Sequence, residues 1–246
     1  MKILVLAIIM GLTGAVQAQS LQDISYFDKD QKLNGQMIKV SSASKGNVLI
    51  LPAWKGIDQE AKNAAAELNK YGYDVFIADI HGGGNIPQDN ASAAKLSGYY
   101  KTNFEAYHHR IKLALEEFIK QGADPSKIAV IGYCFGGTGA LEVVRAGFDV
   151  LGAVSIHGGM SKAADRANLP IKTKVLVQHP AEDKSVSKED YNSLENELKE
   201  GKADYQIITY SNSGHTFTNP QSQDYNPLMA KRAWDHLMLF LKEVLQ

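Results

Sequence analysis

The sequence has almost no cysteine. Cys134 is the single cysteine among 246 residues, so the chain cannot form an intrachain disulfide, and any thiol chemistry falls to this side chain. An excess of charge of one sign is also missing, because 26 lysines and arginines face 27 aspartates and glutamates. We therefore expect no nucleic-acid partner and no electrostatic attachment to an anionic membrane.

Long hydrophobic runs are scarce as well. The apolar stretch at residues 3–16 follows Lys2 and is shorter than the run of about 20 residues that crosses a bilayer, so no stable membrane span is expected. Small side chains at Val16 and Ala18 stand where a signal peptidase reads its site. We expect residues 1–18 to be a signal peptide, residues 19–246 to form the mature domain, and the protein to reach the periplasm of a bacterium.

Apolar segments of strand length alternate along the chain with segments of helical period. This alternation predicts an α/β fold in a single domain, with a mostly parallel central sheet and helices on both faces. A long loop at 81–98 is expected to cover a functional site. The helix at 104–120 is expected to bury Ile111, Leu115, Phe118 and Ile119. Strands are predicted at 48–51, 75–78, 128–131, 151–156, 174–178 and 205–210, and helices at 58–70, 104–120, 137–146, 188–200 and 228–244.

One motif predicts a nucleophile. The segment Gly132-Tyr133-Cys134-Phe135-Gly136-Gly137 follows the apolar strand at 128–131 and precedes a helix. A nucleophile on a sharp strand-to-helix turn needs small neighbours, and glycines two residues before and after Cys134 meet that need. The start of the helix also favours the thiolate over the thiol. The alternative is a buried cysteine that acts only as a small hydrophobic residue.

An acid and a base follow in the chain order that such a nucleophile requires. Asp183 comes after the strand at 174–178, and His215 comes after the strand at 205–210. The imidazole would accept the thiol proton or pair with the thiolate, and the carboxylate would fix its tautomer. Glu182 and His179 lie nearby but are less well placed relative to the strand end. The sequence therefore predicts a triad of Cys134, Asp183 and His215.

The cysteine motif, the loop His179-Pro180-Ala181-Glu182-Asp183 and the segment His215-Thr216-Phe217-Thr218-Asn219-Pro220 resemble the dienelactone hydrolase family of α/β-hydrolases. The resemblance runs from about residue 46 to the C-terminus. It implies an α/β-hydrolase fold, the triad Cys134, Asp183 and His215, and hydrolysis of a small ester or lactone without metal or cofactor. It further implies an oxyanion hole formed by the backbone N–H groups of Trp54 and Phe135.

Two departures from that family pattern affect the expectations. Ala53 stands where the family has a glutamate that controls the ionisation of the cysteine thiol. We therefore expect the thiol of Cys134 to be free of that control and to pair directly with His215. The segment after His215 offers Thr218 and Asn219 where dienelactone hydrolase holds a substrate carboxylate with arginine. Dienelactone is therefore not the expected substrate. Lys55 is the cation beside the predicted oxyanion loop.

Two other motifs resemble functional sites but are not expected to form them. His81-Gly82-Gly83-Gly84 matches an oxyanion signature but follows the wrong strand, so we interpret it as a flexible rim of the site. His108 and His109 are adjacent on a predicted helix and point about 100° apart, so we expect no metal site there.

The sequence is compatible with three functions. The favoured one is a cysteine-dependent hydrolase that acts as a monomer or small homo-oligomer on a small molecule. The second is a ligand-binding protein that kept the pocket and lost turnover, for which Ala53 is the sequence hint. The third is a thiol-redox protein that uses Cys134 without a resolving cysteine in the same chain.

Overall fold

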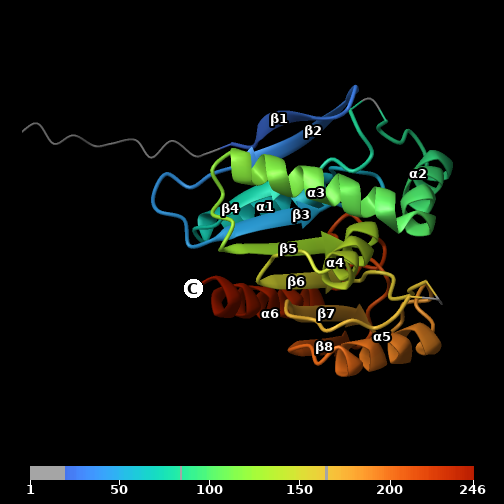
Figure 1. The fold of residues 1–246 in the computed structure, drawn as a ribbon. Helices are drawn as coiled ribbons and strands as arrows, with labels where there is room; N and C mark the ends of the chain where they lie inside the picture. The colour runs from blue at the N-terminus through green and yellow to red at the C-terminus, as the bar shows by residue number, and fades with distance from the viewer. Residues whose placement is uncertain (1–19, 84, 164–165) are drawn as a thin grey trace, which may run out of the picture.

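One mixed β-sheet runs through the protein. In the computed structural model, residues 20–246, apart from 84, 164 and 165, form eight strands and six helices (Figure 1). The predicted signal peptide at 1–18 lies outside the described residues. The strands are β1 (Gln22–Asp28), β2 (Gln31–Ile38), β3 (Asn47–Leu51), β4 (Asp74–Ile77), β5 (Ile128–Tyr133), β6 (Gly152–Ile156), β7 (Lys174–Pro180) and β8 (Tyr205–Tyr210). The helices are α1 (Gln59–Lys70), α2 (Asn90–Thr102), α3 (Phe104–Lys120), α4 (Phe135–Arg145), α5 (Lys188–Glu200) and α6 (Pro227–Leu245).

The strand order is β1-β2-β4-β3-β5-β6-β7-β8. The β1–β2 hairpin is antiparallel and pairs antiparallel with β4, whereas all pairs from β4 to β8 are parallel. Every residue of β3, β4, β5 and β6 is buried, as expected for parallel strands that are covered on both faces. The central strands therefore form the rigid frame of the molecule.

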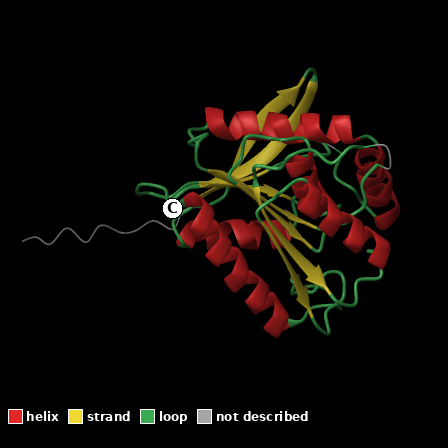
Figure 2. Cartoon of the chain, turned by 60° about the horizontal axis from the view of Figure 1, so that its bottom comes forward, coloured by secondary structure: helices red, strands yellow, loops and turns green. Residues whose placement is uncertain are grey.

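Helices cover both faces of this sheet (Figure 2). Alternate side chains of β3 separate the two layers. Leu49 and Leu51 pack in a cluster with residues of α3 and α4. Val48 and Ile50 pack with residues of α1 and α6. The predicted α/β architecture with a mostly parallel sheet is thus confirmed.

The structure corrects three expectations about individual elements. The β1–β2 hairpin was not predicted, although Leu33 and Met37 alternate with polar residues along β2 and are buried. The loop predicted at 81–98 is wrong in its second half, because α2 begins at Asn90. Asp89 and Ser92 form a reciprocal capping box there, which stabilises the first turn. Ile119 was predicted to be buried but is exposed, and Glu117 takes the buried position instead.

Candidate active site

Cys134 occupies a strained turn between β5 and α4. Its backbone has φ 53° and ψ −111°, a conformation that costs a non-glycine residue about 1 to 3 kcal/mol. Hydrogen bonds on both sides hold it: the Cys134 N–H donates to Ile156 O at 3.0 Å, and its carbonyl accepts from the Thr138 N–H at 3.1 Å. The turn places the thiol at the carboxyl end of β5 and at the first turn of α4, as the motif predicted.

Glycine at position 136 lets the start of α4 approach the end of β3. A Cβ there would lie 1.9 Å from Leu51 O, a backbone atom that cannot swing away. We expect Gly136→Ala to lower the free energy of unfolding by about 3 kcal/mol or more. Gly98→Ala is the matched control, since a Cβ at that helical position meets nothing within 4 Å and should stabilise α2 by up to about 1 kcal/mol. Urea unfolding measures both, and equal effects would contradict the steric argument.

The structure brings the three predicted triad residues together from three different loops. Cys134 Sγ lies 3.1 Å from His215 Nε2, and His215 Nδ1 lies 2.7 Å from Asp183 Oδ2. Ser185, which the sequence analysis did not single out, donates its hydroxyl to Asp183 Oδ1 at 2.6 Å and lies 3.2 Å from His215 Nδ1. The carboxylate is buried and the imidazole is partly exposed. Such an arrangement can hold a thiolate–imidazolium pair.

The local charges favour the ionised forms of the acid and the base. Burial works against the charge on His215, but its hydrogen bonds to Asp183 and Cys134 outweigh that cost and raise its pKa to about 10. Burial likewise opposes ionisation of Asp183, but hydrogen bonds from His215 and Ser185 lower its pKa to about 2. At neutral pH the dyad is therefore an aspartate facing an imidazolium.

The two predicted oxyanion donors lie on neighbouring segments. Phe135 is the first residue of α4, and Trp54 is in the loop that follows β3. His81 connects these segments: its Nε2 lies 2.9 Å from Trp54 O, and its ring stacks on Phe135 with centroids 5.7 Å apart. His81, which the sequence predicted to lie in a flexible rim of the site, is buried, and Gly84 of the same motif lies outside the described residues. Burial lowers the pKa of His81 and keeps its imidazole neutral.

The competing and secondary residues are exposed or contact other partners than the thiol. Glu182 is exposed, and His179 packs on Tyr191 with ring centroids 5.3 Å apart. His108 and His109 turn to different partners, Glu142 at 2.8 Å and Asp28 at 2.9 Å. Across the described part of the chain, no group of three His, Cys, Asp or Glu side chains is arranged to hold a metal ion.

Ala53 and Lys55 flank Trp54 in the loop after β3. Ala53 is buried, whereas Lys55 is exposed, with its Nζ 5.8 Å from the centroid of the Trp54 ring. None of the helices in residues 20–246, leaving aside 84, 164 and 165, combines the length and apolar character needed to cross a membrane.

A buried polar group that no sequence motif predicted lies directly behind the nucleophile. His157 follows β6 and has φ 42°, and the Cys134 N–H is shared between Ile156 O and the Nδ1 of His157, which accepts over 3.1 Å. Its Nε2 lies 2.9 Å from Thr218 Oγ1, and that hydroxyl donates to Glu60 Oε1 at 2.6 Å. No motif links these residues, because they come from three segments that are far apart in the sequence.

Comparisons with known proteins point to one family of hydrolases. The family model described as "Dienelactone hydrolase family" matches residues 34–245. A Bradyrhizobium protein named a probable 2-oxo-3-(5-oxofuran-2-ylidene)propanoate lactonase is 23% identical over 206 residues, which are 79% of this chain and 82% of the relative. The human carboxymethylenebutenolidase homolog is 26% identical over 157 residues, 63% of each chain.

A solved structure shares the whole architecture. The crystal structure of a dienelactone hydrolase-like promiscuous phosphotriesterase from metagenomic libraries is 28% identical, with a TM-score of 0.86 over 94% of this chain and 100% of that one. The expected α/β-hydrolase fold is therefore confirmed. With a family match that covers most of its length, this chain belongs to the dienelactone hydrolase family.

Proposed function

We propose that this member of the family is an exported hydrolase of a small ester or lactone, with Cys134 as the nucleophile, His215 as the acid and base, and Asp183 as the residue that orients and charges His215. The observation that carries the proposal is the continuous contact from Cys134 Sγ through His215 to Asp183, over 3.1 Å and 2.7 Å. The reaction needs no metal or cofactor, because the thiolate is itself the nucleophile.

Acylation begins when the Cys134 thiolate attacks the ester carbonyl. The backbone N–H groups of Trp54 and Phe135 would stabilise the oxyanion that forms. As the tetrahedral intermediate collapses, the C–O bond to the alcohol breaks and His215 gives its Nε2 proton to the leaving alkoxide. The product of this step is an acyl-thioester on Cys134 and a neutral imidazole.

Deacylation reverses the roles of the same groups. The neutral imidazole of His215 takes a proton from water, and the hydroxide attacks the thioester carbonyl. Collapse of the second intermediate releases the acid and regenerates the thiolate–imidazolium pair. Asp183 stays ionised throughout, since the bonds from His215 and Ser185 hold its pKa at about 2.

The names of the relatives favour a lactone among the possible esters. A lactonase and carboxymethylenebutenolidase homologs stand among the similar proteins, and both names describe ring-opening hydrolysis. The alcohol of an opened lactone stays attached to the acyl group. We further propose that residues 1–18 direct the chain to the periplasm and that residues 19–246 form the active domain.

The test is hydrolysis of p-nitrophenyl acetate and butyrate by the chain without residues 1–18, together with mass spectrometry of the protein during turnover. We expect steady release of p-nitrophenol and an acyl adduct on Cys134. An adduct without turnover would mean that deacylation fails. The absence of both, in a folded sample with a free thiol, would contradict the proposal and favour a ligand-binding protein.

A further inference from the structure

A chain of hydrogen bonds runs behind Cys134 and ends on a buried carboxylate. It passes from the Cys134 N–H to His157, from His157 to Thr218, and from Thr218 to Glu60, with distances of 3.1, 2.9 and 2.6 Å. His157 is 1% exposed and the Glu60 side chain is 7% exposed. A polar chain buried to this degree is costly unless each member is satisfied, so its order of donors and acceptors is constrained.

That order fixes the tautomer of His157. The backbone N–H of Cys134 can only donate, so His157 Nδ1 must be the acceptor and Nε2 must carry the proton. The Nε2–H then donates to Thr218 Oγ1, which leaves the threonine hydroxyl free to donate to Glu60. Burial, together with the nearby charge of His215, lowers the pKa of His157 to about 3, so its ring is neutral. Each proton in the chain therefore points away from the nucleophile and toward Glu60.

The chain of hydrogen bonds is connected both to Cys134 and to the loop that carries His215. At one end it contacts the backbone of Cys134, which is held at a positive φ. In its middle, Thr218 lies three residues after His215 in the same loop, and the His157 and His215 rings lie edge to face with centroids 5.3 Å apart. Any change in the strength of the chain therefore acts on the position of the thiol and of the imidazole together.

Glu60 can change its charge near neutral pH. Burial, reinforced by the charge of Asp58, raises its pKa to about 7 against the opposing effects of Thr218 and His215. The titratable groups that face it are Asp58, which caps the same helix, Tyr133 of β5, and His157 and His215 of the loops that follow β6 and β8. Attraction is mutual, so an ionised Glu60 also favours the imidazolium of His215.

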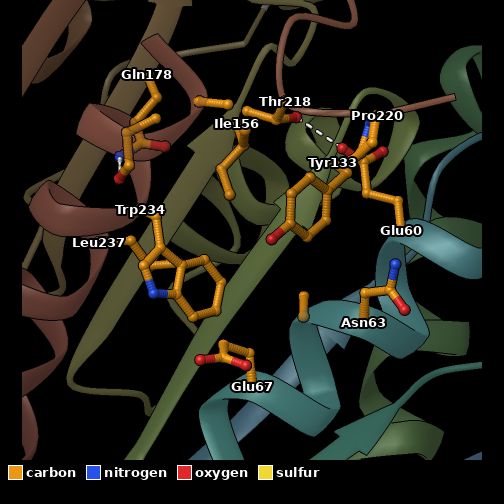
Figure 3. A pocket seen from close by; sticks show the side chains of 13 residues that line it. Glu60, Asn63, Glu67, Tyr133, Ile156, Gln178, Thr218, Pro220, Trp234 and Leu237 are labelled. Atoms are coloured by element: carbon orange, nitrogen blue, oxygen red, sulfur yellow. Dashed lines mark hydrogen bonds between the residues drawn. The ribbon is translucent and has the colours of Figure 1, made fainter. Parts of the chain in front are cut away.

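Glu60 lies beside a cavity through which its carboxyl group can exchange a proton with solvent. Glu60 and Thr218 line a cavity of about 270 Å³ between α1 and α6. Tyr133 and Trp234 also line this cavity (Figure 3). Glu67, two turns further along α1, lines the same cavity but pairs with Lys70. The chain thus reaches solvent on the side of the sheet that α1 and α6 cover.

We propose that Glu60, Thr218 and His157 are positioning residues: they form a relay that holds the Cys134 backbone in its reactive place and couples the reactivity of its thiolate to the charge on Glu60. This inference rests on the proposed role of Cys134 as the nucleophile. In the relay, the carboxylate of Glu60 acts on the thiol through the Cys134 backbone. The loop after β3 provides no carboxylate for this role, because Ala53 stands at the position where the family has a glutamate.

The test is the rate of alkylation of Cys134 by iodoacetamide between pH 5 and 9, which needs no ester turnover. Because the chain has one cysteine, every alkylated thiol reports this site. We expect the rate to rise about threefold to tenfold as the pH passes through about 7, the pKa of Glu60. Glu60→Gln should abolish this rise in the alkylation rate near pH 7. Glu67→Gln should keep the rise, because Glu67 lines the same cavity but lies outside the relay.

Variants of Thr218 distinguish the effect of the hydrogen bonds in the relay from the effect of the charge on Glu60. Thr218→Val removes both hydrogen bonds, so alkylation at pH 8 should slow about fivefold, and the rise should move to higher pH because the bond that lowers the pKa of Glu60 is lost. Thr218→Ser should restore the rate and the rise. Loss of the rise in Glu67→Gln, or an unchanged profile in Glu60→Gln, would overturn the relay.

The two proposals fail in different ways. A relay profile with no ester hydrolysis would contradict the proposed function and leave the coupling intact. Cys134-dependent hydrolysis with the same alkylation profile in wild type, Glu60→Gln and Thr218→Val would support the function and overturn the relay. Thermal melts of each variant show whether a change in rate accompanies a change in folding.

Discussion

Cys134→Ala is expected to abolish ester hydrolysis, lowering kcat/KM by at least about 10⁴-fold. The reason is that the reaction proposed here forms a bond to Cys134 Sγ, and the His215 imidazole lies against that sulfur at 3.1 Å. Alanine keeps the Cβ and hence the backbone conformation at φ 53°, so the fold should be unchanged. The loss would then measure the chemistry and not the stability of the turn.

The measurement is p-nitrophenyl acetate hydrolysis with a thermal melt of each sample. Cys134→Ser is the matched comparison: it keeps a nucleophile in the same place but replaces the sulfur with the less nucleophilic oxygen of a hydroxyl, so its rate should fall between wild type and alanine. Iodoacetamide should inactivate the wild-type protein in step with alkylation. Residual hydrolysis in Cys134→Ala near the wild-type rate would show that the thiol is not the nucleophile.

Most of the fold was predictable because parallel strands and amphipathic helices leave strong local patterns. The run Val48 to Leu51 and the helix that Asp58 caps lie where the sequence placed them. The hairpin β1–β2 was missed because it is an antiparallel edge with many polar side chains, and α2 was missed because its polar, alanine-rich sequence resembles a loop. Both errors concern surface elements, where burial leaves little trace in the sequence.

The residues of the candidate site also fall into two groups, those that the sequence predicts and those that it does not. Cys134, Asp183 and His215 could be named from strand ends and chain order, and the structure brings them together. His157 and Glu60 could not be named, since only the folded chain brings the loop after β6, the first turn of α1 and the loop after β8 into one chain of hydrogen bonds. A buried polar contact depends on long-range geometry, whereas a nucleophile turn is a local property of the backbone.

Asp183→Asn should lower kcat by about a thousandfold, the second-largest effect expected here. In the proposed mechanism, the carboxylate holds Nδ1 of His215 protonated through a 2.7 Å contact and favours the imidazolium that donates a proton to the leaving group. Because the hydrogen bond to Asp183 helps to raise the pKa of His215 to about 10, the variant should lose activity at a lower alkaline pH than the wild type. Glu182→Gln, the exposed neighbouring acid, should change neither the rate nor the pH profile.

Stability should change with pH in a direction that the two pKa values define. The raised pKa of His215 gives a contribution that is complete below its ordinary value of 6.5 and is lost as the pH rises through about 10. The lowered pKa of Asp183 gives one that is present above its ordinary value of 3.8 and is lost as the pH falls through about 2. Asp183→Asn should therefore cost most stability between these two ordinary values and progressively less above them, which urea unfolding at pH 5, 7 and 9 would measure. A loss that is independent of pH would mean that the contact between Asp183 and His215 is not the ion pair on which the proposed mechanism depends.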